Sequence, residues 1–337
     1  MLQGKRTWIF ENRPVIISTA VVGGPFEAKG NIADDFDVLH EDLWLGQDSY
    51  EKAEKVLIEE AFLRTTEKAG LSKDTVQFVL AGNLINQLTP VTFAARTLGV
   101  PFLGQFGACS TSMQGLALAA LIVNSRAGNY VLTGAGSHNA AAEKQFRYPT
   151  EYGSQKPPTA QWTVTGAGAA LIADQGDGPR VTEATIGRVV DMGLTDPFNM
   201  GGAMAPAAVD TIEAHFRDTG RNISDYDLIV TGDLGHVGRE ASLDLFAKHH
   251  FPIDEKKYQD CGLMIYAENQ PVLAGASGTA CSAVVVYGHL LNRMKKGELN
   301  RILSVATGAL LSPLSVQQKE SIPCIAHAVT IENGGVA

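Results

Sequence analysis

The stretch that decides the fold is Gln105-Phe-Gly-Ala-Cys-Ser-Thr-Ser-Met-Gln-Gly-Leu-Ala-Leu-Ala-Ala-Leu-Ile-Val-Asn124. Every residue from Leu116 to Val123 is apolar, and a helix that is hydrophobic all round belongs inside a domain. Cys109 stands in a glycine turn where this helix is expected to begin, with small residues on either side. The unpaired N–H groups and positive dipole end of a helix favour a thiolate. Cys109 is therefore either a buried structural cysteine or a nucleophile.

Composition excludes several classes of function. The 337 residues carry a formal net charge of -9, and no basic stripe offers a nucleic-acid interface. The four cysteines lie far apart without a C-x-x-C pair, which suits a reducing compartment. The histidines show no metal-binding spacing and the glycines no nucleotide-binding motif, so we expect neither metal nor cofactor. A signal peptide and an apolar run of roughly 18 residues are both missing, which predicts a soluble, intracellular chain.

The order of predicted elements occurs twice along the chain. Each copy reads strand, polar excursion, helix, strand, helix, central apolar helix, strand and strand, and the second copy begins after Gly176. In that copy we predict helices over 207–216, 242–249 and 283–291, the last being the central one. Strands that alternate with helices form sheets covered by helices on both faces. We therefore predict an α/β fold of two pseudo-symmetric halves, residues 1–175 and 176–337, in five αβαβα layers.

Two histidines follow predicted strands and are candidates for a site with Cys109. His236 lies in Gly232-Asp-Leu-Gly-His-Val-Gly-Arg-Glu240, and His138 lies in Gly136-Ser-His-Asn139. A nucleophilic cysteine needs a base or a charge partner together with an oxyanion donor. We expect His236 to face Cys109 from the second half and His138 to line the same cavity, although each histidine by itself is as readily structural.

These residues carry a family resemblance. The Cys109 turn, the His236 loop, the strand over 165–171 and the turn over 306–312 occur in the order seen in thiolases and type III ketoacyl-acyl-carrier-protein synthases. The chain resembles that superfamily over nearly its whole length. The resemblance implies a thiolase fold, an oxyanion turn at Thr307-Gly308-Ala309, and a homodimer paired through a short strand near Phe102.

The resemblance breaks at the third catalytic group. The asparagine of type III synthases falls on Ser277, or on Gly278 in a register shifted by one, and the second histidine of thiolases falls on Val272. His236 is then the only expected side-chain donor for an enolate, and losing a preorganised donor costs about 10²–10³ in rate. We expect a binding protein on a scaffold that has lost condensation, with Cys109 and His236 vestigial. The alternatives are an active acyltransferase or condensing enzyme that uses both, and a structural subunit with a vestigial pocket.

Within the superfamily, the stretches 106–113, 136–139 and 232–239 resemble the stage V sporulation protein AD family of endospore-forming bacteria. This resemblance implies dipicolinate as the ligand, free or as its calcium chelate. It also implies membrane-embedded proteins of a sporulation transport complex as partners, on the cytoplasmic side of the forespore inner membrane. The residues that we assign to the ligand pocket are Cys109, His138, Tyr152, His236, Ser277 and Gly308. Tyr148 and Tyr152 are expected as a flat wall, and charge near the mouth is expected from Lys144, Arg147, Lys156 or Arg239.

Overall fold

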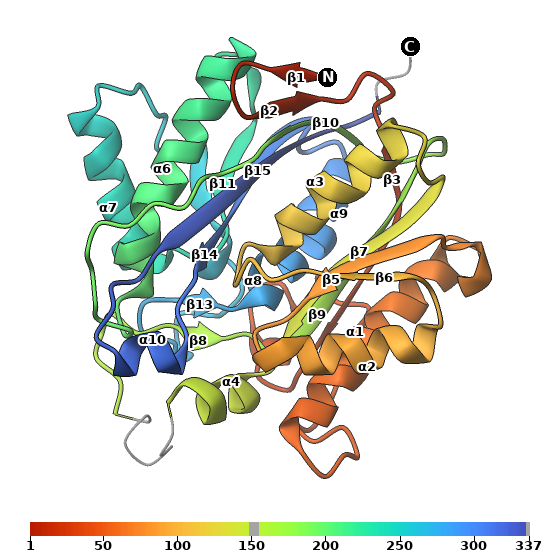
Figure 1. The fold of residues 1–337 in the computed structure, drawn as a ribbon, viewed down its shortest axis with the longest axis horizontal. Coiled ribbons are helices and arrows are strands. Elements are labelled where there is room, and N and C mark those ends of the chain that lie inside the picture. Colours follow the sequence, from red (N-terminus) through yellow and green to blue (C-terminus); the bar gives the residue numbers. More distant parts are fainter. Residues whose placement is uncertain (148–154, 335–337) are drawn as a thin grey trace.

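The computed structural model describes residues 1–147 and 155–334. Ten strands form the main path of one twisted sheet in the order β12-β11-β14-β15-β10-β3-β9-β7-β5-β6 (Figure 1). The strands of the first half are β3 (Val15–Gly23), β5 (Phe78–Gly82), β6 (Phe102–Gly104), β7 (Tyr130–Ser137) and β9 (Gly166–Ala173). Those of the second half are β10 (Arg180–Thr185), β11 (Leu228–Thr231), β12 (Tyr258–Asp260), β14 (Arg301–Ala309) and β15 (Cys324–Glu332).

The strand order is the same on both sides of residue 176. In each half the first strand in the chain is followed across the sheet by the fifth, fourth, second and third. The two runs join where Val15 of β3 pairs antiparallel with Arg180 of β10. The shorter strands are β1 (Leu2–Gln3), β2 (Thr7–Ile9), β4 (Val38–Leu39), β8 (Trp162–Thr163) and β13 (Ala276–Ser277). Of these, β8 and β13 form a separate parallel pair that joins the two halves beside Ser277.

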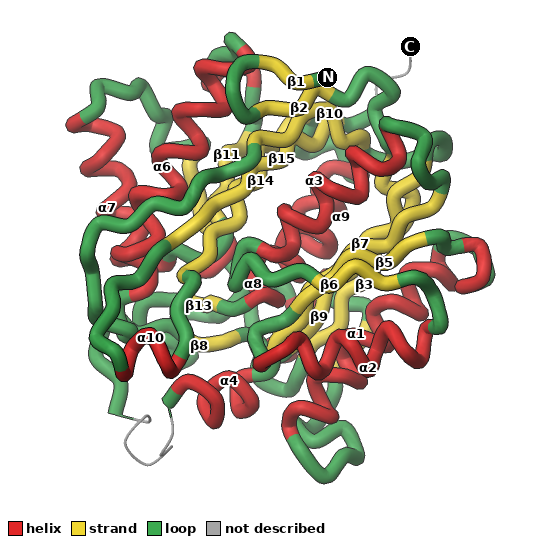
Figure 2. Tube along the Cα trace, in the orientation of Figure 1, coloured by secondary structure: helices red, strands yellow, loops and turns green. Residues whose placement is uncertain are grey.

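Helices separate and cover the two runs of strands in the layered order that the sequence predicts (Figure 2). Between the runs lie α3 (Thr111–Asn124), α8 (Thr279–Val284), a π-helical turn η7 (Val285–Leu290) and α9 (Leu291–Lys295). The outer faces carry α1 (Tyr50–Lys68) and α2 (Thr89–Leu98) on the first half and α6 (Met200–Thr219) and α7 (Gly235–Lys248) on the second. Two short helices, α4 (Asn139–Phe146) and α10 (Pro313–Gln317), lie at one end of the molecule.

The central helices are buried as their composition predicts. No residue of α3 is exposed, and its apolar side chains share one core cluster with those of α8 and η7. The Ser112 and Ser282 hydroxyls lie 2.7 Å apart between α3 and α8, and the Tyr287 hydroxyl donates to the Ser112 carbonyl at 3.0 Å. The two halves therefore meet along their central helices.

Helix boundaries in the second half differ from the predictions. Helix α6 begins at Met200 rather than at 207, because Asn199 caps it by accepting from the Gly202 N–H, and Pro206 is accommodated inside it. Helix α7 begins at Gly235 rather than at 242. The segment predicted as one helix over 283–291 starts four residues earlier and contains the π-helical turn.

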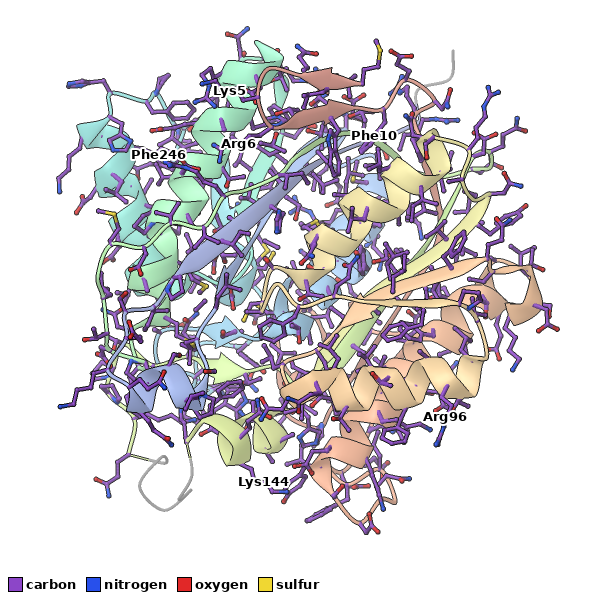
Figure 3. All side chains as sticks on the ribbon, in the orientation of Figure 1. Lys5, Arg6, Phe10, Arg96, Lys144 and Phe246 are labelled. Carbon is purple, nitrogen blue, oxygen red and sulfur yellow. The ribbon has the colours of Figure 1, made fainter. Side chains whose placement is uncertain are left out.

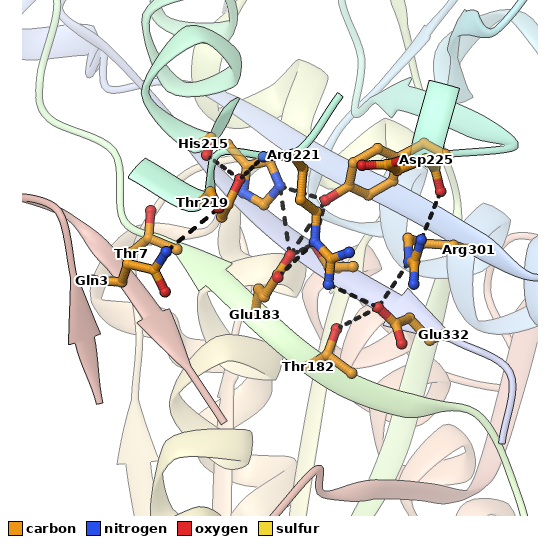
Figure 4. A network of polar contacts seen from close by, with 12 residues as sticks. Gln3, Thr7, Thr182, Glu183, His215, Thr219, Arg221, Asp225, Arg301 and Glu332 are labelled. Carbon is orange, nitrogen blue, oxygen red and sulfur yellow. Dashed lines mark hydrogen bonds and ion pairs between the residues drawn. The ribbon is translucent and has the colours of Figure 1, made fainter. Parts of the chain in front are cut away.

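A buried polar network joins α6 to the strands β10 and β15 (Figure 4). The imidazole of His215 contacts the Tyr226 hydroxyl at 2.6 Å. Glu183 accepts from Arg221 at 2.7 Å, and Arg221 also donates to Glu332 at 3.2 Å. Burial lowers the pKa of His215 to about 3, so this histidine is neutral in the folded protein. None of the helices in the described part of the chain combines the length and hydropathy needed to cross a bilayer.

Candidate functional site

Cys109 lies in a tight turn two residues before α3. Its neighbour Ala108 has a φ of 48°, a left-handed conformation that costs a non-glycine residue roughly 1–2 kcal/mol. The turn bonds to itself, because the Gly107 carbonyl accepts from the Ser110 N–H at 3.1 Å and the Ala108 carbonyl accepts from the Thr111 N–H at 3.2 Å. These two donors of the helix N-terminus are therefore already used and do not point into an open anion site.

Ser277 and Asp233 are the polar neighbours of the Cys109 thiol. The Cys109 Sγ atom lies 3.8 Å from Ser277 Oγ, and Ser277 Oγ donates to Asp233 Oδ2 at 2.7 Å. The other carboxylate oxygen of Asp233 accepts from the Thr307 hydroxyl at 2.8 Å. Asp233 is fully buried and lies in the loop between β11 and α7. The chain thus places a serine and a carboxylate, not an imidazole, beside the cysteine.

The surroundings oppose a thiolate at Cys109. Burial is the largest cause that raises the pKa of this thiol well above its usual value, and the negative charge of Asp233 raises it further. A neutral thiol is a poor nucleophile. The expectation that the helix N-terminus favours a thiolate is therefore wrong for this site, because desolvation and the neighbouring carboxylate dominate.

A cavity of about 540 Å³ opens above Cys109 and Ser277. Its wall is mostly apolar and contains three phenylalanines, Phe106, Phe146 and Phe198. Helix α4 contributes Ala142 and Gln145, while the segment from β14 through α10 contributes the residues Ala309, Leu311, Pro313, Val316 and Gln317. The cavity therefore lies at the junction of the two halves, with the thiol on its floor.

Arg147 supplies positive charge to the wall of this cavity. Its guanidinium pairs with Glu143 and lies 5.6 Å from the centre of the Phe198 ring. Glu143 also accepts from Lys156 at 2.8 Å, so among the described residues two cations share this one carboxylate, with a local excess of positive charge. Of the four cations expected near the mouth, Arg147 is the one that lines the cavity. Lys144, labelled in Figure 3, extends from α4 at the edge of the molecule. It pairs with Glu51 of α1 at 2.8 Å, and Arg239 donates to the Tyr258 carbonyl.

The structure does not place His236 opposite Cys109. This residue is the second of α7 and is exposed, and it is not among the described residues that line the cavity. The prediction that it faces the thiol is wrong, because β11 ends at Thr231 and the helix has already begun when the chain reaches position 236. Asp233, three residues closer to the strand, occupies the position facing the cysteine.

His138 is buried but faces away from the cavity. Its Nε2 atom is 2.9 Å from the Leu43 carbonyl, and its ring stacks on Tyr50 with the centres 5.2 Å apart. Burial lowers the pKa of this imidazole, which keeps it neutral. His138 therefore packs against the segment between β4 and α1, and the expectation that it lines the pocket is wrong.

The remaining residues predicted for the ligand pocket are Ser277, Gly308 and Tyr152, and the structure places them differently. Ser277 lines the cavity, whereas Gly308 does not. Gly308 belongs to β14 rather than to a turn, and a Cβ atom there would meet the Gly107 carbonyl at 2.2 Å. It thus permits the strand to pass directly behind the Cys109 turn. Tyr152, like Tyr148, lies outside the described residues.

Asp233 is the site residue that the sequence-based reasoning missed. The available signal was its place directly after the strand, in Gly232-Asp233-Leu234, where a side chain at the strand end reaches the interface between the halves. The first half repeats the pattern as Gly82-Asn83-Leu84 after β5, and Asn83 is also buried. Within the described part of the chain, no group of three His, Cys, Asp or Glu side chains is arranged to hold a metal ion.

Comparison with known proteins shows which protein family this chain matches. A family model described as stage V sporulation protein AD matches residues 4–332. Stage V sporulation protein AD of Bacillus subtilis (strain 168) is 48% identical over 336 residues, which cover 100% of this chain and 99% of that protein.

Solved structures of condensing enzymes share the fold at low identity. The 3-oxoacyl-[acyl-carrier-protein] synthase III from Aquifex aeolicus VF5 has a TM-score of 0.58 at 14% identity, over 95% of this chain and 99% of that chain. Xanthomonas campestris OleA with bound lauric acid and lauroyl-CoA has a TM-score of 0.59 at 14% identity, over 96% and 100%. The predicted thiolase fold is confirmed.

Proposed function

The chain belongs to the stage V sporulation protein AD family, and from this membership and its cavity we propose that it binds dipicolinate above Cys109 and carries out no condensation there. It is a sporulation protein on a thiolase-like scaffold. The observation that carries the proposal is the pair Cys109 and Ser277 on the cavity floor, with Asp233 behind Ser277. In support of the proposal, a cavity lies above Cys109, and the described residues that line it include no histidine that could activate the cysteine.

The cavity wall suits a flat anion. Dipicolinate is a planar aromatic ring with two carboxyl groups. The guanidinium of Arg147 is the type of group that binds a carboxylate through two parallel hydrogen bonds, and Phe198 lies beside it. Because Arg147 and Lys156 share Glu143, this wall is positive even though the protein has a net charge of -9. One carboxylate of the ligand is assigned to Arg147.

The cavity floor does not suit condensation. Acyl transfer to a cysteine needs a base that activates the thiol, and decarboxylative condensation needs donors for the enolate oxygen. Among the described residues that line the cavity there is no histidine and no asparagine. The alternative of an active acyltransferase is favoured by one observation, namely that Cys109 lies on the floor of an apolar cavity of about 540 Å³.

The wider setting of the proposal comes from the family. We assign the protein to the cytoplasmic side of the forespore inner membrane, where it works with membrane-embedded proteins of a dipicolinate transport complex. The calcium chelate of dipicolinate is a second form in which the ligand is delivered. The assembly is assigned as a homodimer through the edge strand β6.

Calorimetry and intact-mass analysis of the purified protein test the proposal together. We expect dipicolinate to bind with a stoichiometry of one per chain and the protein mass to stay unchanged after incubation with acyl-coenzyme A. Pyridine, which has the ring nitrogen but no carboxylate, serves as the matched ligand and is expected to bind more weakly. A stable gain of one acyl group on Cys109 with turnover, or no binding of dipicolinate, would contradict the proposal.

A further inference from the structure

We propose that Asp233 turns the cavity floor into a hydrogen-bond acceptor, so that the site selects a ligand with one anionic end and one uncharged donor end. The donor end is a protonated carboxyl or a carboxamide, and it meets Ser277, while the anionic end meets Arg147. This inference rests on the proposed function, because it concerns the same cavity and specifies the protonation state of its ligand.

The hydroxyl proton of Ser277 is directed toward Asp233 and away from the cavity. A serine hydroxyl has one proton to donate and two lone pairs that accept. Ser277 Oγ donates to Asp233 Oδ2 at 2.7 Å. Asp233 Oδ2 also accepts from the Gly278 N–H at 3.2 Å. Thr307 already accepts from the Asp233 N–H at 3.2 Å and donates to Oδ1 at 2.8 Å. With its proton committed to the carboxylate, Ser277 presents only lone pairs to the cavity.

In the part of the chain that the structure describes, no cation neutralises a charge on Asp233. Asp260 lies next to it, with its carboxylate bonded to the Thr231 hydroxyl at 2.6 Å and to the N–H groups of Leu234 and Gly235. The other titratable groups that interact with this pair are the thiols of Cys109, Cys261, Cys281 and Cys324 and the hydroxyl of Tyr258. Among the described residues neither aspartate forms an ion pair with Lys, Arg or His.

Hydrogen-bond donors around Asp233 favour its ionised form and oppose the effect of burial. Burial is the largest effect and leaves the pKa of Asp233 raised, whereas the hydrogen bonds from Cys109, Ser277, Thr307 and Gly278 limit this rise. The thiol of Cys109 stays protonated beside this carboxylate. The turn before α3 uses the N–H groups of Ser110 and Thr111 internally, so these donors do not offset the negative floor.

The two ends of the cavity are therefore polarised in opposite senses. Arg147 on the wall attracts a carboxylate, whereas a second carboxylate placed against Ser277 would meet lone pairs backed by the Asp233 charge. A monoanion that carries a proton at its far end satisfies both positions. A dianion satisfies only one of them, and repulsion at the other weakens its binding.

Calorimetry at pH 8 with two matched ligands tests this inference. Dipicolinate is a dianion at this pH, and 6-carbamoylpyridine-2-carboxylate is a monoanion of nearly the same shape. We expect the carbamoyl compound to bind about tenfold or more tightly than dipicolinate, the worth of about one hydrogen bond. We also expect dipicolinate to bind more tightly as the pH falls from 8 to 5 and the monoanion becomes more populated.

The variant Asp233→Asn assigns the preference to Asp233. It removes the negative charge behind Ser277 while keeping the shape of the side chain, so the preference for the carbamoyl compound should fall at least about tenfold. Ser277→Ala removes the accepting hydroxyl without touching Asp233, and it should also lose the preference, which keeps the test available if Asp233→Asn does not fold. Asp191→Asn, a matched change at the exposed carboxylate that accepts from Ser321, should leave the preference intact.

The outcomes separate this inference from the proposed function. If wild-type protein binds dipicolinate at pH 8 as tightly as the carbamoyl compound, the inference is overturned and dipicolinate binding stands. An unchanged preference in both folded variants also overturns it, because the floor polarity then has another source. If neither ligand binds at any pH from 5 to 8, the inference and the proposed function both fall.

Discussion

The hydroxyl of Ser112 on α3 lies 2.7 Å from the hydroxyl of Ser282 on α8, at the place where the central helices of the two halves meet. Both side chains are buried. Cys109 precedes Ser112 by three residues and Ser277 precedes Ser282 by five. The contact therefore holds together the two helix starts that carry the polar residues of the cavity floor.

Replacing one serine of this pair should lower the free energy of unfolding by more than half of the loss that replacing both serines causes. Ser112→Ala or Ser282→Ala leaves the other hydroxyl without this partner in a buried position, so each is expected to lower the free energy of unfolding by about 1–3 kcal/mol. The double variant should lose less than the sum, because no hydroxyl is then left unpaired. Urea denaturation of the four proteins measures this coupling, and strictly additive losses would contradict it.

The neutral, buried His215 should make stability depend on pH. Its folded pKa of about 3 lies below the ordinary value of 6.5, so below pH 6.5 the unfolded chain takes up a proton that the folded chain does not. Its contribution is fully present above pH 6.5 and is lost toward pH 3, with a slope of about 1.4 kcal/mol per pH unit.

Urea denaturation between pH 7 and pH 4 measures this slope. His215→Gln should be less stable at pH 7 but should show a slope smaller by about one proton. Other titrating groups, among them His327 with a pKa lowered to about 4, remain in both proteins and cancel in the difference. His249→Gln, at an exposed histidine, is the control, and equal slopes in wild type and His215→Gln would refute the assignment.

Loss of the Arg147 charge should weaken ligand binding. Arg147→Gln removes the guanidinium from the cavity wall, and we expect dipicolinate affinity to fall by about 1.5–3 kcal/mol, the range for a hydrogen bond to a charged group. Lys156→Gln removes a cation that also pairs with Glu143 but does not line the cavity, so its effect should be smaller. Calorimetry compares the two variants. An equal or larger loss in Lys156→Gln would move the anion contact away from Arg147.

The edge strand β6 should mediate dimer formation. Leu103 is 51% exposed in this strand, and Phe93 and Phe106 beside it are 44% and 49% exposed. An apolar edge strand with unpaired backbone groups is a site for pairing with another chain. We expect light scattering to give about twice the chain mass for wild type and a single chain mass for Leu103→Asp. Leu314→Asp, at an exposed leucine of α10, should stay dimeric, and a monomeric wild type at micromolar concentration would rule the interface out.

The order of elements could be predicted from the chain because it depends on local patterns. The all-apolar segment 116–123 requires burial wherever it lies, and as part of α3 its residues are buried or half-buried. The β-branched run at Val15–Gly23 forms a strand, and Tyr50–Lys68 forms a helix capped by Ser49, which accepts from the Lys52 N–H. The repeat of this order predicted two halves that share one topology, and the sheet shows that strand order on both sides of residue 176.

The identity of the residue facing Cys109 was decided only in three dimensions. His236 and Asp233 belong to the same short motif, and the sequence alone favoured the residue with the more useful chemistry. Which of them turns toward the interface depends on where β11 stops and α7 starts, because a shift of three residues turns a side chain from the interface to solvent. The direction of the His138 side chain could not be predicted from its own segment either, because it depends on the carbonyl of Leu43, which is distant in the sequence.

Local sequence therefore determined the helices, the strands, their order and the cysteine turn, all of which follow from the spacing of apolar and small residues within one segment. The tertiary structure decided that Asp233 lies behind Ser277, that Arg147 lines the cavity and that both candidate histidines lie elsewhere. Those relationships join segments separated by tens to more than a hundred residues. Their geometry comes from how the two halves pack along α3 and α8, and no short-range pattern in the chain encodes it.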